Sequence, residues 1–320
     1  MNQSGDGSNT FISIIILNYN GLSLNRETFL AAIRCALDVN LASKEVILVD
    51  NCSTDGSLEY VMNHFSSMLK IVALKQNLGH AGGMNAGARA SSSDAVYLVF
   101  VNNDVRYDRA VISSLVKFLD ENPRVAACSC LEVFPHRDKD FCGSYYDLGL
   151  FNVAPHEGCD PFLVTTVENL IVVRKEVFTM LGGFDECLLN VFDEQEFCLR
   201  IWMSGYSVAC YPNVNFIHNH TLPIKDTPNR WALDLKNKYL TILKLYSIRG
   251  IVGQLSVRVL RDLYRSLTND TWRKNKMYLR IIRVLIEIIA SPCYIESRKR
   301  FSSVKKYDEK DLYRLGIIKG

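Results

Sequence analysis

The sequence predicts an α/β fold organised around a parallel sheet of the nucleotide-binding type. Short apolar runs that read as buried strands alternate with amphipathic stretches that read as helices, and turns rich in Asn and Asp follow the strands. Alternation of this kind is typical of a parallel sheet with crossover helices. The expected order in the first part of the chain is strand, helix, strand, helix, strand, at residues 11–17, 28–39, 46–49, 57–69 and 71–74.

The next apolar run, residues 96–101, ends in Asn102, Asn103 and Asp104, and a helix-like run follows at 109–120. Ligands of α/β sheets bind just beyond the carboxyl ends of the strands. Asp104 is a hard oxygen ligand at such a place, suited to Mg²⁺ or Mn²⁺ that carries phosphate oxygens. The triplet is equally typical of a helix-capping turn, so both interpretations stay open on these residues alone.

Composition is that of a globular protein with an uneven charge distribution. The 320 residues suffice for one large or two modest domains, with 48% hydrophobic and 22% charged residues. Residues 221–320 hold 22 Lys and Arg against 9 Asp and Glu, whereas residues 1–220 hold 15 against 25. A basic last third suggests an anionic partner surface, phospholipid or nucleic acid. No apolar run reaches the roughly 18–20 residues that span a bilayer.

The ten cysteines show no CxxC pair and no zinc-type spacing, and no signal peptide opens the chain. We therefore expect free thiols in a reducing cytosol. The expected location is cytoplasmic, with peripheral contact at the inner face of the cell membrane as one arrangement that the basic tail would allow.

Two polar turns are expected at the same edge of the sheet, after the first and second strands. Such turns offer what a nucleoside needs, namely a carboxylate for ribose hydroxyls, an amide for a base edge and an aromatic ring for stacking. Asp50, Asn51 and Tyr19 fit these three roles. Taken singly, each is more simply an ordinary polar loop residue.

A glycine-rich stretch at residues 77–87 follows the third strand, and residues 86–90 look helical. Four glycines in nine residues would let the backbone approach a ligand closely. The stretch is neither GxGxxG nor a P-loop.

In the second half, residues 125–134 predict a strand pair or a strand and turn, and residues 165–173 a strand. Residues 135–162 have little periodicity and are the candidate for a mobile acceptor loop. Glu168 and Asn169 are acceptor contacts in one interpretation and solvent-facing strand residues in the other.

The segments IIILNYNG, VILVDNCSTDGS, NLGHAGGMNAG and VFVNNDV together resemble the donor half of family 2 glycosyltransferases. The resemblance implies a GT-A fold that uses a divalent metal, Mg²⁺ or Mn²⁺. The triplet that ends in Asp104 takes the place of the DxD-type motif, and Asn102 at its first position resembles the rhamnosyltransferase-like branch. Asp104 would hold the metal, Asn103 would lie near the ribose, and Asn51 would contact the base. The resemblance assigns four further residues to the donor site: Leu17, Asn77, Gly82 and Asn85.

Gly-Gly-Phe-Asp-Glu at 182–186, followed by Asp-Glu-x-Glu at 193–196, resembles the acceptor half of that family. The second carboxylate of the cluster is the family's catalytic base, which implies Glu194, with Asp193 beside it in the catalytic cluster. From the residues alone, Asp193 and Glu196 favour a structural role, with Arg200 pairing with Glu196 at i+4.

The resemblance also places a histidine six residues after Pro212, which is His218. It implies that His218 ligates the metal or contacts the diphosphate. His220 shares its strand face, and the pair raises a zinc interpretation, but no third ligand lies near at the usual spacing.

The basic tail predicts helices at 234–245, 251–267 and 277–290, with a further helix from Asp308. Basic residues that flank an apolar face suit an interfacial helix on anionic lipid. The alternative is that these helices pack on the catalytic domain or join a second copy as a homo-oligomer.

We expect a GT-A glycosyltransferase domain at residues 10–225 and a basic amphipathic helical region at 226–320. The implied activity is inverting transfer of a sugar from a dTDP- or UDP-linked donor to a hydroxyl of a glycan or lipid-linked glycan. The alternative is a non-catalytic subunit that binds sugar nucleotides or glycans. Nucleic acid is not an expected partner, because no RNA-binding motif is present.

Overall fold

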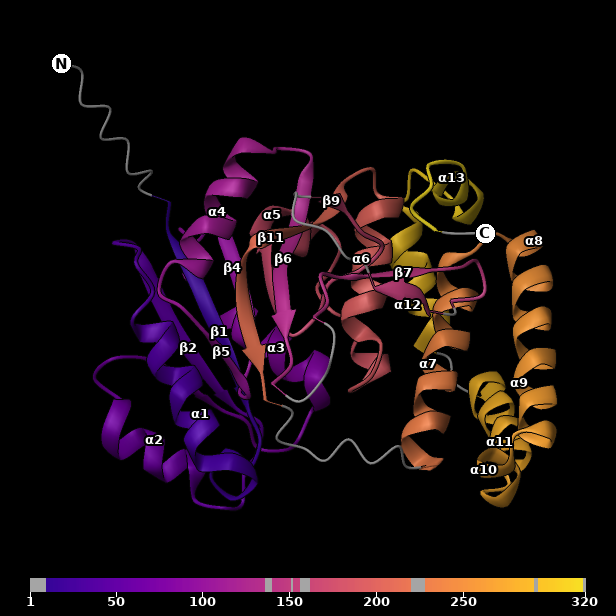
Figure 1. The fold of residues 1–320 in the computed structure, drawn as a ribbon, viewed down its shortest axis with the longest axis horizontal. Helices are drawn as coiled ribbons and strands as arrows, with labels where there is room; N and C mark the ends of the chain where they lie inside the picture. Colours follow the sequence, from indigo (N-terminus) through magenta and orange to yellow (C-terminus); the bar gives the residue numbers. More distant parts are fainter. Residues whose placement is uncertain are drawn as a thin grey trace.

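The computed structural model describes residues 10–135, 140–150, 152–155, 162–219, 228–290 and 293–318. A central mixed sheet lies between two layers of helices, and the C-terminal helices pack beyond one of these layers (Figure 1). The predicted α/β class with flanking helices and a helical C-terminal extension is therefore confirmed.

Nine strands of the described residues form the main sheet, in the order β3-β2-β1-β4-β10-β6-β11-β5, with β9 beside β11. The first four are mutually parallel, as predicted. β10 runs antiparallel to both β4 and β6, so the second half of the sheet is mixed. The strands are β1 (Ile12–Asn18), β2 (Lys44–Asp50), β3 (Lys70–Ala73), β4 (Tyr97–Asn102), β5 (Val105–Tyr107), β6 (Val125–Val133), β9 (Phe162–Leu163), β10 (Leu170–Arg174) and β11 (Ser207–His218).

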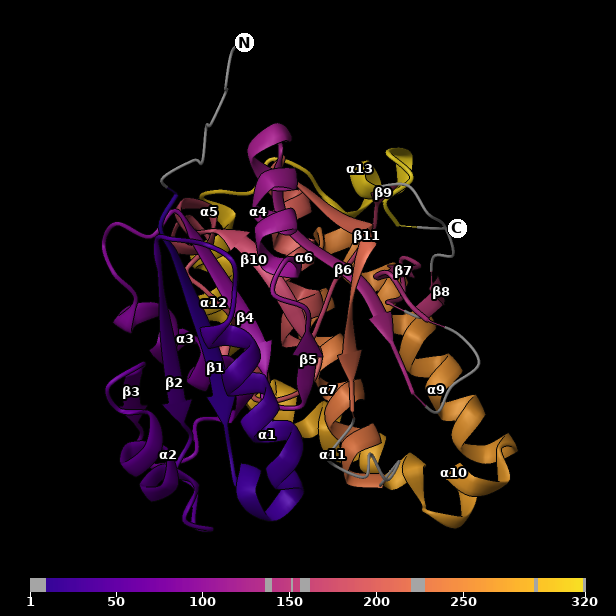
Figure 2. The same ribbon diagram turned by 60° about the vertical axis from the view of Figure 1, so that its left-hand side comes forward.

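Each face of the sheet has its own apolar core. Ile12, Ile14 and Ile16 on β1 join the core beneath one helical layer, whereas Ile15 points into the other core. Figure 2 shows α1 and α4 in front of the sheet strands. The first layer holds α1 (Gly21–Leu37), α2 (Ser57–Phe65) and α4 (Val111–Glu121), and the second holds α3 (Gly79–Ala90), α5 (Lys175–Met180) and α6 (Asp193–Met203).

The glycine-rich stretch is a helix rather than a ligand loop, because α3 already begins at Gly79. A Cβ atom added at Gly83 would lie 2.3 Å from Leu17 Cδ1, and one at Gly87 would lie 2.3 Å from Ile15 Cγ2. These two glycines therefore allow the helix to pack closely on β1. The expected loop was wrong, because glycine serves close packing of a helix on strand side chains as well as approach of backbone to a ligand. The donor role of Gly82 stays a prediction.

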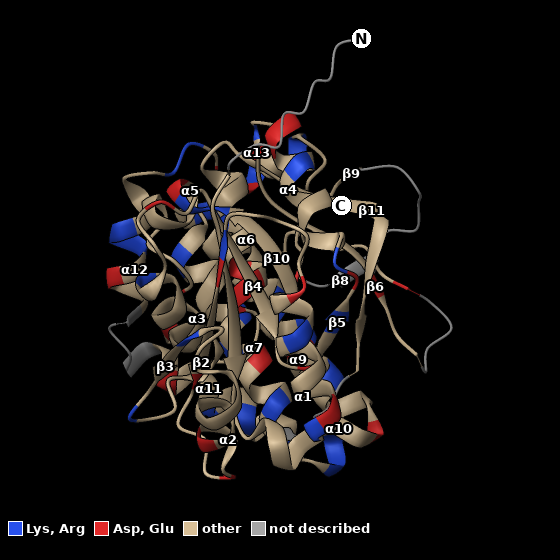
Figure 3. Cartoon of the chain, turned by 90° about the vertical axis from the view of Figure 1, so that its left-hand side faces the viewer, with Lys and Arg blue, Asp and Glu red and all other residues tan. Residues whose placement is uncertain are grey.

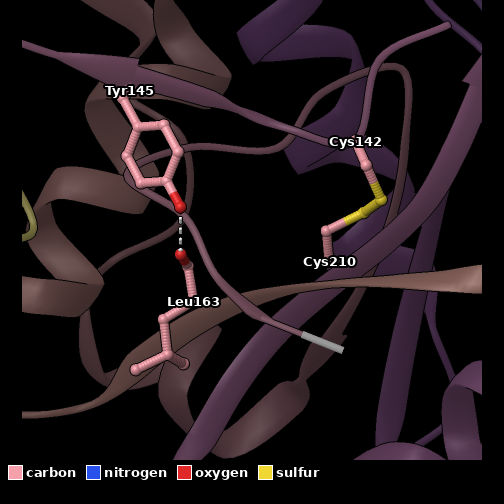
Figure 4. Close-up of a disulfide and its surroundings, with 4 residues drawn as sticks. All are labelled: Cys142, Tyr145, Leu163 and Cys210. Atoms are coloured by element: carbon pink, nitrogen blue, oxygen red, sulfur yellow. Dashed lines mark hydrogen bonds between the residues drawn. A yellow bond between two sulfur atoms is a disulfide. The ribbon is translucent and has the colours of Figure 1, made fainter. Parts of the chain in front are cut away.

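The segment predicted as an irregular acceptor loop contains paired strands. β7 (Ser144–Tyr146) and β8 (Asn152–Pro155) pair in antiparallel fashion, and a disulfide joins Cys142 to Cys210 on β11 (Figure 4). The Tyr145 hydroxyl donates to the backbone oxygen of Leu163 at 2.9 Å in the same region. The described part of this segment is thus fastened to the sheet edge.

The expectation of free thiols throughout was wrong. The Cα atoms of Cys142 and Cys210 are 5.6 Å apart although 68 residues separate them, so no local spacing could reveal the pair. Cys187 is also disulfide-bonded. Five described cysteines are free: Cys35, Cys52, Cys128, Cys130 and Cys198.

The C-terminal helices share the core of the sheet and also build one of their own. Ile242, Tyr246 and Phe301 join the core under α6, whereas Tyr239 and Ile281 belong to a separate helical core. Among the described residues, no helix combines the length and the apolar content that a bilayer crossing needs. The helices are η1 (Glu186–Leu188), α7 (Pro228–Leu245), α8 (Ile248–Gly250), η2 (Ile251–Leu255), α9 (Ser256–Thr268), α10 (Asp270–Lys274), α11 (Met277–Ala290), α12 (Cys293–Ser302) and α13 (Glu309–Arg314).

Candidate active site

The site begins where β4 ends. Asn102 is the last residue of β4, and Asn103 and Asp104 form the turn into β5, which starts at Val105. The triplet therefore connects two strands and does not cap a helix, so the helix-cap interpretation was wrong, and the metal role of Asp104 stays a prediction. Backbone pairing fixes the turn, because Asn219 N donates to Asp104 O at 3.0 Å.

Asp104 lies against His218, the last residue of β11. His218 Nε2 is 3.3 Å from an Asp104 carboxylate oxygen, and its Nδ1 is 2.5 Å from Glu132 Oε1 on β6. Burial lowers the pKa of His218, but hydrogen bonds with Asp104 and Glu132 outweigh this and raise it to about 10. His220 lies outside the described residues.

These side chains fit one half of a divalent metal site. A carboxylate on the far nitrogen of a histidine orients the ring and makes it a better ligand, which is the position of Glu132 on His218. Within the described ranges, no group of three or more His, Cys, Asp or Glu residues could hold a metal. Mg²⁺ and Mn²⁺ accept such a partial set, because phosphate oxygens of a ligand and water complete their coordination.

Asn169 connects this pair to the carboxylates of α6. Its Nδ2 donates to Glu132 at 2.9 Å, and its backbone N donates to Glu194 Oε1 at 3.1 Å. Its Oδ1 accepts a hydrogen bond from Asn102 Nδ2 at 3.1 Å. Asn169 has a φ of 69°, a left-handed conformation that Asn tolerates better than most residues. It precedes β10, which starts at Leu170, so the prediction of Glu168 and Asn169 as strand residues was wrong.

His80 closes a ring of contacts around the site. Its Nε2 lies 3.1 Å from Asn102 Oδ1, and its Nδ1 lies 2.6 Å from an Asp193 carboxylate oxygen. Burial lowers the pKa of His80, but the charge and hydrogen bond of Asp193 dominate and raise it to about 10. Through His80 and Asn169, the end of β4 is tied to the first turn of α6.

Glu194 is buried in this ring, and burial is the main cause that raises its pKa to about 8. The positive charge of His80 opposes the shift, whereas Asp193 and Glu168 add to it. Glu168 accepts a hydrogen bond of 2.5 Å from Gln195. Its pKa is raised to about 7, first by burial and then by the nearby charge of Glu132.

The predicted nucleoside residues lie at the ends of β1 and β2. Asn18 Nδ2 donates to Asp50 at 2.9 Å, and Asn18 Oδ1 accepts from Asn103 Nδ2 at 3.2 Å. Asp50 is buried and also accepts from Ser53 N. Tyr19 is 44% exposed, and its stacking on a base stays a prediction.

The other predicted donor residues hold the elements around the site together. Asn51 donates to Asn77 Oδ1 at 3.1 Å and so fixes the start of α3. Asn85 is buried and bonds both backbone groups of Phe184. Leu17 packs against Gly83, and a Cβ atom at Gly82 would lie 2.7 Å from Leu78 Cβ. Their roles toward a donor stay predictions.

The predicted pair of Glu196 and Arg200 is confirmed, with Arg200 Nη2 at 2.9 Å from a Glu196 carboxylate oxygen. Lys244 from α7 approaches Glu196 to 3.1 Å and also contacts Asp185. These groups are buried and join α6 to the Gly-Gly-Phe-Asp-Glu turn and to α7, which agrees with the structural role expected for Glu196.

Sequence reasoning missed three residues of the site, namely His80, Glu132 and Asn18. Glu132 carried a signal, since it is the one charged residue in the strand sequence VAACSCLEV and its side chain is buried. His80 stood inside the glycine-rich stretch that was attributed to backbone approach. Asn18 ends the first strand and was passed over in favour of its neighbour Tyr19.

Comparison with known proteins finds similarity to glycosyltransferases, and the solved structures that match have a GT-A-type fold. Residues 13–144 match the profile of glycosyl transferase family 2. A dTDP-rhamnosyl transferase, RfbF of Shigella flexneri, is 29% identical over 235 residues, which cover 66% of this chain and 76% of the relative. Together these findings support a family 2 glycosyltransferase that resembles rhamnosyltransferases.

More distant matches agree on the fold. An N-acetylgalactosaminyltransferase 4 of Drosophila melanogaster is 24% identical over 58% of this chain, which spans only 32% of that protein. The structure of S. aureus TarS 1-349 aligns with a TM-score of 0.59 at 14% identity, over 96% of this chain and 92% of TarS. The structure of the mannosyltransferase PcManGT from Pyrobaculum calidifontis, in complex with GDP-Man and Mn²⁺, aligns with a TM-score of 0.55 at 17% identity. The alignment covers 92% of this chain and 84% of PcManGT.

Proposed function

We propose that this protein is an inverting glycosyltransferase that moves a sugar from a dTDP- or UDP-linked donor to a hydroxyl of a glycan or lipid-linked glycan. One observation carries the proposal. Asp104 and Glu194 belong to one unbroken series of contacts, through His218, Glu132 and Asn169. A diphosphate held at Asp104 and a hydroxyl held at Glu194 would therefore meet in the same site.

Donor binding is assigned to the edge formed by β1, β2 and β4. Tyr19 offers a stacking surface for the base, and Asp50, Asn51 and Asn103 supply polar groups around the nucleoside. The rhamnosyl relative supports a dTDP-linked donor, and the family resemblance leaves a UDP-linked donor as the other choice.

Asp104 and His218 would hold a divalent metal together with the donor diphosphate. The metal, when bound, supplies positive charge that stabilises the departing nucleoside diphosphate. Glu132 keeps the His218 ring in one orientation, with its Nε2 3.3 Å from an Asp104 carboxylate oxygen, so a metal ion would replace the proton shared by these two groups.

Glu194 is proposed as the base that removes the proton of the acceptor hydroxyl. Inverting transfer is a single displacement: the acceptor oxygen bonds to the anomeric carbon as the bond to the diphosphate oxygen breaks. A raised pKa makes the Glu194 carboxylate a stronger base than an ordinary carboxylate, and the backbone N–H of Asn169 holds one of its oxygens in place. Glu168, beside Asn169, is proposed to contact the acceptor.

The test is the variant Glu194→Gln, which keeps the size of the side chain and removes its basicity. We expect transfer to fall by about 10²–10⁴-fold, with the donor dissociation constant changed less than threefold. The matched control is Glu176→Gln, the same chemical change on the exposed side of α5. Transfer at the parental rate by Glu194→Gln would refute the assigned base. Absence of metal-dependent nucleotide release by the parent protein, with every candidate donor, would favour the non-catalytic binding subunit.

A further inference from the structure

The helical segment of residues 248–268, which comprises α8, η2 and α9, has its apolar face turned outward. Six large apolar residues recur along it at helical spacing, each of them 57–75% exposed. Figure 1 shows α9 at the outer edge of the molecule, on the side away from α1 and α2. This outward face, called the apolar stripe below, consists of Ile248, Val252, Val257, Leu260, Tyr264 and Leu267.

The opposite side of α9 faces the protein: its buried residues are polar, and Val259 and Leu263 pack beside them on the C-terminal core. Arg258, Asp262 and Ser266 are all buried, at the i, i+4, i+8 spacing of one helix face. Arg258 donates to the backbone oxygen of Gly149 at 2.6 Å, and Asp262 accepts from the Tyr239 hydroxyl at 3.0 Å.

These buried partners fix the rotation of α9 about its axis. Turning the helix to bury the apolar stripe would expose Arg258 and Asp262 and break their contacts with Gly149 and Tyr239. The ion pair between Arg258 and Asp262 lies within α9 and turns with it, so the bonds to Gly149 and Tyr239 are the ones that hold the rotation. The outward position of the apolar stripe is therefore a specified feature of the fold, and a contiguous exposed patch of this kind marks an interaction surface.

The charges beside the apolar stripe indicate the kind of partner. The exposed charged residues of this segment are Arg249, Arg261 and Arg265, and its one acidic residue, Asp262, is buried. Two copies that packed stripe to stripe would bring arginines toward arginines, which costs free energy. α10 follows α9 in the chain and carries both basic and acidic residues (Figure 3). Its acidic residue, Asp270, is paired with Arg273 at 2.7 Å.

We propose that the apolar stripe lies on an anionic phospholipid surface, with its leucines, isoleucine and tyrosine in the boundary between headgroups and acyl chains. Apolar side chains flanked by arginine suit such a boundary, because the guanidinium groups reach the lipid phosphates while the apolar side chains leave water. The sequence suggested interfacial contact for the helices of the basic tail. α11 buries Met277, Ile281 and Val284 in the C-terminal core, and it also exposes Leu279, Ile282 and Ile286. Its surface carries an acid, Glu287, that already pairs with Lys236 and Arg283, whereas the one acid of residues 248–268 is buried. The lipid contact is thus assigned to α8–α9 and does not depend on the proposed catalytic residues.

The experiment is flotation of the full chain with vesicles of phosphatidylcholine alone or with 30% phosphatidylglycerol (about one anionic lipid in three). We expect flotation with the anionic vesicles and loss of it at high salt, because salt screens the arginine contacts. Leu260→Glu should weaken binding at least tenfold, since it places a carboxylate in the apolar stripe. The matched control is Met62→Glu, on an exposed position of α2 at the other end of the molecule (Figure 1), which should bind as the parent does.

A second variant keeps the test decisive if Leu260→Glu fails to fold. Arg249→Ala removes one exposed charge, and each surface arginine contributes about fivefold to binding of anionic lipid. Equal flotation of Leu260→Glu and the parent would overturn the proposal, as would no flotation of the parent with anionic vesicles. A protein-concentration-dependent dimer that forms without vesicles and is abolished by Leu260→Glu would also overturn it, in favour of a second copy.

Discussion

His80 Nδ1 lies 2.6 Å from the Asp193 carboxylate, although 113 residues separate the two side chains in the chain. Because His80 also contacts Asn102, it ties the first turn of α6 to the end of β4. Its positive charge also faces Glu194 and partly offsets the effect of burial on that carboxyl. His80 is thus placed to position the two halves of the site and to govern the basicity of Glu194.

Replacing His80 by glutamine should move the pH dependence of transfer upward. Removal of the imidazolium charge takes away the largest influence that opposes burial and leaves only the hydrogen bond from Asn169 N, so the pKa of Glu194 rises and less of it is ionised at neutral pH. Each unit of that rise lowers the rate near pH 7 about tenfold, and the rate should recover as the pH is raised. The measurement is the rate at saturating donor and acceptor from pH 6 to 10. A rate loss that is the same at every pH would show a purely structural role.

The unmodified protein should itself have an alkaline profile. Glu194 must be ionised to accept a proton, and its pKa is raised to about 8 by burial, so transfer should increase from about pH 6.5, reach half its maximum near pH 8 and level off above about pH 9. An ordinary glutamate would give a flat profile over this range, because its pKa lies near 4.3. The profile is then repeated with an acceptor whose hydroxyl is more acidic. A midpoint set by Glu194 stays at the same pH, whereas a midpoint set by the acceptor moves to lower pH. A flat profile between pH 6 and 9 would remove Glu194 as the titrating base.

The sequence predicts the donor side of the fold well, and the physical reason is local. Strands such as β1 and β4 are continuous apolar runs, and their polar ends fall at one sheet edge by the geometry of parallel strands. The links across the site join residues far apart in the chain, as in the contact of Glu132 with His218 over 86 residues. Such contacts leave no periodic trace, which is why His80 and Glu132 were missed.

Contacts between residues far apart in the chain also determine which way the apolar stripe faces. From the sequence, the apolar face of the helix expected at 251–267 fits either contact with lipid or packing on the protein, and both alternatives stayed open. Only the tertiary contacts of Arg258 and Asp262 show that the polar face is the inner one. The α/β class and the helical tail could thus be predicted, whereas the direction in which α9 faces could not.

Removing the carboxylate that orients His218 should weaken metal binding without abolishing it. Glu132→Gln keeps the shape of the side chain but withdraws the charge from Nδ1 of His218, and loss of such a partner typically costs about 10–100-fold in metal affinity. The measurement is Mn²⁺ titration in the presence of donor, followed by isothermal calorimetry. Asp104→Asn serves as comparison and should lower the affinity further, because it removes a proposed ligand. An unchanged Mn²⁺ affinity in Glu132→Gln would contradict a metal site at His218.

Glu196 offers a test of stability that is separate from catalysis. Its carboxylate is buried between Arg200 and Lys244, so Glu196→Ala leaves two cations in the interior with one acid, Asp185, beside Lys244. Breaking a buried pair in this way costs about 3–5 kcal/mol in the free energy of unfolding. The control is Glu121→Ala, which breaks an exposed ion pair with Lys117, where the nitrogen and oxygen are 3.9 Å apart. Loss of this surface pair should cost under about 1 kcal/mol. Urea unfolding at pH 7 measures both, and equal midpoints for the two variants would mean that the Glu196 cluster does not hold α6 to α7.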